Sequence, residues 1–236
     1  MPPADNTPAK QSSSTVAAFL QKVAAAPVAV AGSRGRLIFA MDATASRGPT
    51  WAQAMAIQAD MFRAAAGVGG LDVQLAYYRG LLEFGASPWM VDAASVIAVM
   101  RGVTVLSGQT QIERVLRHAA AEARRGKVNA LVFIGDTLEE SADAVLAAAG
   151  DVALRGVPVF IFHEGGGEPA GSVFRQVASL TKGAYSPFDA GSAAQLRDLL
   201  TAVAIFAAGG RKALSDLSAR SGGAARLLLA DLTGKG

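Results

Sequence analysis

Short apolar segments of strand length, repeated along the chain, constrain the fold more than any other feature of this sequence. We predict strands at residues 36–41, 130–134 and 157–162, in which apolar side chains follow one another without alternation and Pro158 stands near the start of the third. Such a strand has no polar face to turn toward water. It therefore has to be covered on both faces, which is the situation of a parallel sheet between two layers of helices.

Helical patterns fill the intervals between these strands. A strand pair interrupts the alternation, because residues 73–77 alternate as in a strand and residues 81–84 can form its hairpin partner. Gly183 is expected as a left-handed cap before a last short strand that begins at Ala184. The pattern predicts an α/β fold with a doubly wound, mostly parallel sheet flanked by helices, a three-layer sandwich. The predicted helices span residues 52–66, 91–101, 111–125, 138–149, 173–181 and 193–207.

The length of 236 residues suits one domain with short additions, and a hydrophobic content of 51% is ample for a sizeable core. We expect residues 1–34 to form an N-terminal arm with a short helix. Residues 35–208 are expected to form the α/β domain, and residues 209–236 a C-terminal helix or tail.

The composition excludes several classes of function. Because the chain has no cysteine, disulfides, thiolate metal sites and thiol catalysis are all excluded. The apolar stretch 16–28 has no basic segment before it, so a secretory signal is not expected. Apolar windows such as residues 202–208 fall far short of the roughly 18 residues that span a bilayer. We therefore expect a cytoplasmic protein that does not enter a membrane.

The net charge of +3 gives no reason to expect a nucleic acid partner. The one basic concentration lies at residues 114–127, where most of the basic side chains recur at helical spacing opposite an apolar face. No aromatic residues are interleaved for base stacking, so a solvated helix face explains these charges.

Side chains that carry oxygen gather after the predicted strands. Asp42 follows the first strand, with Thr44 and Ser46 at alternate positions after it, and Asp136 ends the strand 130–134 after one glycine. Thr110 lies in a glycine-containing loop before a helix. Because the carboxyl ends of parallel strands share one edge of a sheet, we expect these five side chains at the same rim. Hydroxyl and carboxylate oxygens are ligands that suit Mg²⁺, a hard cation.

These five residues make the sequence resemble the von Willebrand factor A family, in its soluble bacterial form. The metal-ion-dependent adhesion site of that family uses Asp-x-Ser-x-Ser, a loop Thr, and an Asp at the end of a later strand. Asp42, Thr44, Ser46, Thr110 and Asp136 match these positions in order. The resemblance covers about residues 35–205, and it includes a helix, glycine turn and short strand at 176–185.

The resemblance implies a binding module and not an enzyme. Thr44 and Ser46 would bind the metal directly, Thr110 directly or through water, and Asp42 and Asp136 would balance its charge. The metal would be Mg²⁺, with Mn²⁺ or Ca²⁺ as alternatives, and its open position would accept an Asp or Glu of another protein. Soluble members of the family often act as adaptors in multi-protein assemblies.

Three departures from the family pattern affect this prediction. Thr44 stands where the family more often has Ser, although the hydroxyl is kept. Gly135-Asp136-Thr137 replaces the common Thr-Asp-Gly, which alters the loop and keeps the acid. Arg47 follows Ser46 directly, where a cation either attracts an acidic partner or weakens metal binding.

Local structure offers another interpretation of the same residues. The segments 110–113 and 137–140 both read as capping boxes, so that Thr110 and the Asp136 segment would only start helices. Asp42, Thr44 and Ser46 would then form a polar turn before Pro49. His163 and Glu164, which follow the strand 157–162, are further polar side chains expected at the rim.

Two other functions stay open. The first is a phosphatase like the haloacid dehalogenases, with Asp42 as nucleophile and Mg²⁺ bound at Asp136. Such enzymes need a second acid two residues after the nucleophile and a paired acid later, where this chain has Thr44 and Thr137. The second is a structural interaction domain with an inactive metal site.

Overall fold

The computed structural model describes residues 18–23, 25–26, 34–44, 48–189, 191 and 193–220. Ser46 and Arg47 lie outside the described residues, as do most of the expected N-terminal arm and the last part of the tail. Strands and helices alternate along most of the chain. The strands are β1 (Gly35–Asp42), β2 (Leu71–Arg79), β3 (Glu83–Ala86), β4 (Ala130–Gly135), β5 (Val159–Glu164) and β6 (Ala184–Phe188). The helices with defined bounds are α2 (Gly48–Ala66), α3 (Ala93–Gly102), α4 (Ile112–Arg125), α5 (Ala142–Leu154), α6 (Ala170–Leu180) and α7 (Ala193–Arg220).

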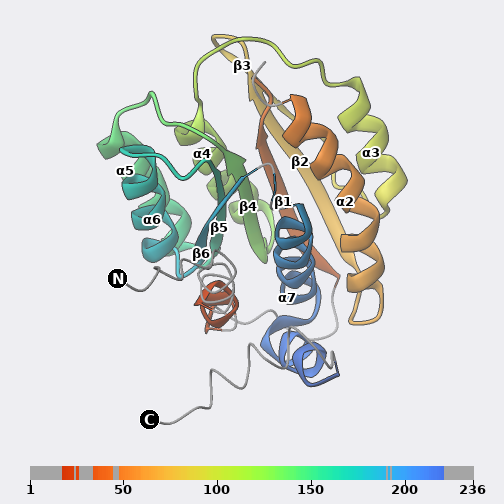
Figure 1. Cartoon of the computed structure of the whole chain (residues 1–236). Coiled ribbons are helices and arrows are strands. Elements are labelled where there is room, and N and C mark those ends of the chain that lie inside the picture. Colours follow the sequence, from red (N-terminus) through yellow and green to blue (C-terminus); the bar gives the residue numbers. More distant parts are fainter. Residues whose placement is uncertain are drawn as a thin grey trace, which may run out of the picture.

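The six strands form one sheet in the order β3-β2-β1-β4-β5-β6. All neighbouring pairs are parallel except β2 and β3, which form an antiparallel hairpin at one edge. Helices α4, α5 and α6 cover one face of the sheet, and α2, α3 and α7 cover the other (Figure 1). The predicted doubly wound, mostly parallel α/β sandwich is confirmed.

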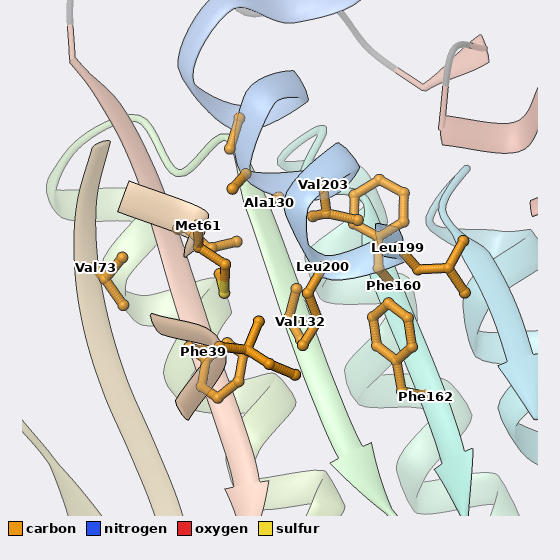
Figure 2. Close-up of a cluster of buried hydrophobic side chains, with 14 of the residues drawn as sticks. Phe39, Met61, Val73, Ala130, Val132, Phe160, Phe162, Leu199, Leu200 and Val203 are labelled. Atoms are coloured by element: carbon orange, nitrogen blue, oxygen red, sulfur yellow. The ribbon is translucent and has the colours of Figure 1, made fainter. Parts of the chain in front are cut away.

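Both faces of the central strands are buried, which is why their sequences are apolar without alternation. Toward α2 and α7, Phe39 of β1 and Val132 of β4 pack with Leu200 and Val203, and Figure 2 shows this layer. Residues 18–23 are helical, and the ring of Phe19 lies 5.3 Å from that of Phe162. Residues 1–17 lie outside the described residues, and the limits proposed for the arm, domain and tail stay predictions.

Several helix ends differ from the sequence prediction for identifiable reasons. Helix α5 begins at Ala142, capped by the Ser141 side chain, and not at residue 138. Lys182, with φ of 57°, takes the left-handed position that we expected for Gly183. Gly183 is needed instead for close packing, because a Cβ there would lie 1.9 Å from the Val159 carbonyl oxygen. Helix α7 is kinked at Gly210, in keeping with a further helix after residue 209.

The hairpin and the segment after α3 shape the carboxyl end of the sheet. The strand β3 lies two residues later than predicted, because Gly80 adopts a φ of 58° and the turn extends to Leu82. From the end of α3, residues 103–110 cross above the strands to reach α4 (Figure 1). Across the described part of the chain, no helix has both the length and the apolar character needed to cross a membrane.

Candidate metal site

The carboxyl ends of β1 and β4 bring two aspartates to the same edge of the sheet. Met41 is paired with Ile134, so Asp42 and the Gly135-Asp136 segment leave the sheet side by side. Asp42 is buried, with 1% of its surface exposed, and Asp136 is half-buried. They border a pocket of about 270 Å³, called here the carboxyl-end pocket. Its lining residues are Asp42, Thr44, Ser107, Gly108, Thr110, Asp136, Thr137 and Glu139.

Four of the predicted site residues therefore border one pocket, and Ser46 lies outside the described residues. The backbone N–H of Thr44 donates a hydrogen bond of 2.7 Å to Asp42 Oδ1. The Asp42–Thr44 part of the polar turn that we considered as an alternative is thus present, and this part also brings Thr44 to the pocket. A turn and a binding site are not exclusive explanations of these residues.

The capping-box interpretations are wrong at both segments. Gln111, and not Thr110, is the N-cap of α4, and its side chain makes no capping hydrogen bond. The Thr110 hydroxyl accepts the backbone N–H of Glu139 at 2.9 Å, while the Thr110 N–H donates to Glu139 Oε2 at 3.1 Å. Thr137 does not start a helix, because α5 begins five residues later.

Glu140 caps α4 from a distant part of the chain. Its carboxylate accepts the backbone N–H groups of Ile112 and Glu113, the latter at 2.9 Å. A carboxylate at a helix N-terminus also interacts favourably with the helix dipole. Together with the Thr110–Glu139 pair, this contact ties the loop after β4 to the loop before α4, so the two halves of the pocket wall are fixed relative to each other.

A buried phenol lies beneath the pocket. Tyr78 of β2 is paired with Asp42, is fully buried, and has its ring stacked on Phe133 of β4 at 6.4 Å. Its hydroxyl makes no hydrogen bond of ordinary geometry with the described residues, although the Asp42 carboxylate lies close enough to interact with it. Burial raises the pKa of Tyr78 well above its ordinary value, and the negative charges of Asp42, Glu140 and Asp136 raise it further. The phenol is therefore a neutral donor surrounded by carboxylates.

These features fit a hard divalent cation. Converging carboxylates repel one another, and a cation between them removes that repulsion. In the part of the chain that the structure describes, no three or more His, Cys, Asp or Glu side chains are grouped so as to hold a metal. A metal at the carboxyl-end pocket would thus depend on hydroxyl and carboxylate oxygens together, a donor set that suits Mg²⁺ better than a soft metal.

His163 supports the Asp136 loop from below. It is fully buried, with Nε2 lying 2.8 Å from the Asp136 carbonyl oxygen and Nδ1 2.9 Å from the Tyr185 hydroxyl. Burial lowers the pKa of His163, which favours the neutral ring. Because a carbonyl only accepts, Nε2 carries the hydrogen and Nδ1 accepts from Tyr185. The sequence placed His163 at the rim, and the structure gives it a supporting contact and not a place in the pocket.

Glu164, the other polar side chain expected at the rim, is paired elsewhere. The hydroxyl of Thr50, in the first turn of α2, donates to Glu164 Oε2. This contact joins the end of β5 to the start of α2. Neither residue lines the carboxyl-end pocket.

Comparison with known proteins identifies the fold. No family model and no curated protein matches this chain. Solved structures do match, among them a von Willebrand factor type A protein from Catenulispora acidiphila with a TM-score of 0.58 and 15% identity over 74% of this chain. Another is the von Willebrand factor domain of the type V pili tip protein Mfa5 from Porphyromonas gingivalis, with a TM-score of 0.57 and 11% identity over 74% of this chain.

A third similar structure holds a metal. It is proximal thread matrix protein 1 from the mussel byssus, described as having a zinc-occupied MIDAS (metal-ion-dependent adhesion site) motif. It matches with a TM-score of 0.59 and 14% identity over 74% of this chain. The match spans 48% of that protein and 43% of the Catenulispora protein, but 95% of the Mfa5 domain. At these identities the likeness shows the fold alone: this chain has the fold of von Willebrand factor type A domains.

Proposed function

We propose that this chain is a metal-dependent protein-binding module, with a divalent cation held by Asp42, Thr44, Ser46, Thr110 and Asp136. The observation that carries the proposal is the convergence of the four described members of this set on the carboxyl-end pocket. They come from three separate segments of the chain, in the order of the adhesion motif.

The side chains have distinct tasks in this proposal. Hydroxyl oxygens of Thr44 and Ser46 would contact the cation directly, that of Thr110 directly or through water, and Asp42 and Asp136 would balance its charge. Thr110 keeps a lone pair for this purpose, because the Glu139 N–H occupies only one of the two on its oxygen. A bound cation supplies an open coordination position to which a partner's Asp or Glu carboxylate can bind.

Mg²⁺ is our proposed cation, with Mn²⁺ and Ca²⁺ as alternatives, because the donors are hard oxygens. The zinc reported for the mussel protein supports a divalent cation at such a motif, in that protein. We also propose that the partner belongs to a multi-protein assembly. The cytoplasmic location and the lack of enzymatic activity stay predictions.

Calorimetric titration with Mg²⁺ tests the proposal. Wild type is expected to bind Mg²⁺, and Asp42→Ala to lose that binding because the buried charge that offsets the cation is gone. Asp92→Ala is the matched control, since Asp92 is exposed at the other end of the sheet. If wild type binds none of Mg²⁺, Mn²⁺ and Ca²⁺, the proposal is wrong. The alternative, a structural interaction domain with an inactive metal site, would then remain.

A second substitution of Asp42 distinguishes this proposal from the phosphatase alternative. Hydrolysis of phosphate esters by wild type, lost in Asp42→Asn, would support a nucleophilic Asp42. The residue two positions later is Thr44 and not an acid, so we expect no such activity.

A further inference from the structure

Two neighbouring leucines stand exposed at the carboxyl end of the sheet. Leu81 and Leu82, in the turn between β2 and β3, are 70% and 82% exposed. Leu106, in the segment that crosses above the strands, is 40% exposed. Single exposed leucines are common in soluble proteins, but apolar side chains that gather on one surface mark interaction sites.

The turn that carries these leucines is firmly held. Gly80 accepts the Gln109 N–H at 3.1 Å and donates to the Leu106 carbonyl at 3.4 Å. The Arg79 guanidinium donates to the Thr104 carbonyl at 2.7 Å. Leu81 and Leu82 are thus presented to solvent by a turn that is bonded to the crossing segment on several sides.

The same contacts place the turn beside the carboxyl-end pocket. Gly108, which lines the pocket, packs so tightly on Gly80 that a Cβ would lie 1.9 Å from the Gly80 carbonyl oxygen. Leu106 donates its N–H at 3.1 Å to the carbonyl of Ala43, the residue between Asp42 and Thr44. Leu81 therefore directly follows Gly80, the residue whose backbone packs against Gly108 in the pocket wall.

A cation completes this surface. Arg114 donates to the Leu82 carbonyl at 2.9 Å and to Gln111 Oε1 at 3.2 Å, and its guanidinium lies 5.3 Å from the ring centre of Phe84. Unlike Arg79 and Arg117, which pair with glutamates, Arg114 forms no ion pair with a carboxylate of the described residues. Its charge is available to an acidic group from outside.

We propose that Leu81, Leu82 and Arg114 form the second half of the docking surface, next to the metal. The occupant is a partner segment in which an acidic residue is accompanied by an apolar side chain. The acid would reach the cation, the apolar side chain would cover the leucines, and a further acid would pair with Arg114. This inference rests on the proposed metal-dependent function, and adds the apolar requirement to it.

Selection from a library of short random peptides tests the inference. Peptides are bound to the full chain in Mg²⁺, released with a chelator, and labelled for fluorescence anisotropy. The selected peptides are expected to carry an Asp or Glu within a few positions of a Leu, Ile, Met or Phe. The double variant Leu81→Ser and Leu82→Ser should weaken binding about tenfold or more, because burial of one leucine already accounts for such a factor.

Leu154→Ser is the matched control. Leu154 is 85% exposed at the C-terminal end of α5, away from the pocket, so this variant should bind the peptides like wild type. The exposed positions also mean that all these variants should melt like wild type. Arg114→Gln should cause a smaller loss than the leucine pair, one that disappears at high salt.

The outcomes separate this inference from the proposed function. Chelator-sensitive peptides that bind the leucine variant as well as wild type would overturn the docking surface and leave the metal-dependent function intact. Selected peptides that are acidic without an apolar residue would do the same. A library that yields no chelator-sensitive peptide overturns the inference, and calorimetry without Mg²⁺ binding overturns the proposed function as well.

Discussion

The two ends of the sheet each have a pocket, and the larger one is the poorer candidate for a binding site. The carboxyl-end pocket measures about 270 Å³. At the amino ends of β1 and β2, a pocket of about 510 Å³ is lined by residues that include Arg34, Arg63, Gly70 and Asp92, and is called here the amino-end pocket.

The polar groups of the amino-end pocket are used by the protein itself. Arg34 donates to the Asp72 carboxylate at 2.5 Å and to the carbonyls of Leu71 and Val91. Asp92 caps α3 by accepting from the backbone and the hydroxyl of Ser95, which lower its pKa. The smaller pocket instead gathers three acids, Asp42, Asp136 and Glu139, together with the hydroxyl-bearing residues Thr44, Ser107, Thr110 and Thr137. The kind of side chains that gather in a pocket, and not its volume, therefore marks the candidate site.

Glycine substitutions should separate the two pockets most strongly. In Gly108→Ala the new Cβ meets backbone that cannot move aside, so we expect a loss of about 3 kcal/mol of stability or more, and loss of Mg²⁺ binding. In Gly70→Ala the new Cβ meets only the flexible end of Arg34, and the φ of 83° costs about 1 to 2 kcal/mol, with Mg²⁺ binding unchanged. Urea denaturation and calorimetry measure both effects. Normal Mg²⁺ binding by folded Gly108→Ala would show that the Gly80–Gly108 contact does not shape the carboxyl-end pocket.

The two carboxylates that cap helices near these pockets give the next test. Glu140→Ala should cost about 1 to 2 kcal/mol, because two N–H groups of α4 lose a charged acceptor, and should weaken Mg²⁺ binding. Asp92→Ala should cost about 1 kcal/mol through loss of the α3 cap, with no change in Mg²⁺ binding. Equal Mg²⁺ affinities for the two variants would show that the Glu140 contact does not shape the site.

Substitutions of two tyrosines should change the stability of the protein in opposite directions. Tyr78→Phe removes a buried hydroxyl that makes no hydrogen bond of ordinary geometry with the described residues, so in a chelator the variant should be more stable than wild type by about 1 kcal/mol. Tyr185→Phe removes a hydroxyl that bonds to His163 and should be less stable by about 1 kcal/mol. Thermal melts without metal measure both. Destabilisation of Tyr78→Phe would mean that its hydroxyl already has a stabilising contact.

The smallest effect concerns His118, which borders neither pocket. It belongs to the basic segment 114–127, which we expected to form a solvated helix face, but it is half-buried and its Nε2 lies 2.9 Å from Gln74 Oε1. Burial lowers the pKa of His118 from 6.5, so the folded state takes up a proton less readily than the unfolded state. Wild type should therefore lose stability as the pH falls below 6.5, and His118→Gln should lose less. Urea midpoints at about pH 7.5 and about pH 5.5 measure this difference, and equal losses would contradict the assignment.

The sequence was sufficient for the sheet and for the edge at which polar residues meet. Strands such as β4 are apolar throughout because both of their faces are covered. Such a pattern lies within one short segment, so it can be recognised from the sequence alone. The positions of Asp42, Thr110 and Asp136 in the sequence also allowed us to predict that they share one rim of the sheet, because the carboxyl ends of parallel strands lie on the same side.

What the sequence could not predict are contacts between distant segments. In the sequence, Thr110 fits a capping box as well as it fits a loop. Only the fold shows that Glu139 and Glu140, some thirty residues later, accept the backbone N–H groups before and at the start of α4. His163 gave a signal only through its place after a strand. Its bond to the Asp136 carbonyl depends on the pairing of β4 with β5, which no local pattern reveals.

The exchange of hydrogen bonds between Thr110 and Glu139 has a thermodynamic consequence. Each residue donates one hydrogen bond to the other and accepts one from it, so the two loops are joined without a bound ion. The entropy cost of ordering these loops is therefore already part of folding. An ion that binds between such loops has little chain to immobilise. Its affinity would then be set by dehydration and charge, and its binding would leave the heat capacity of the protein nearly unchanged.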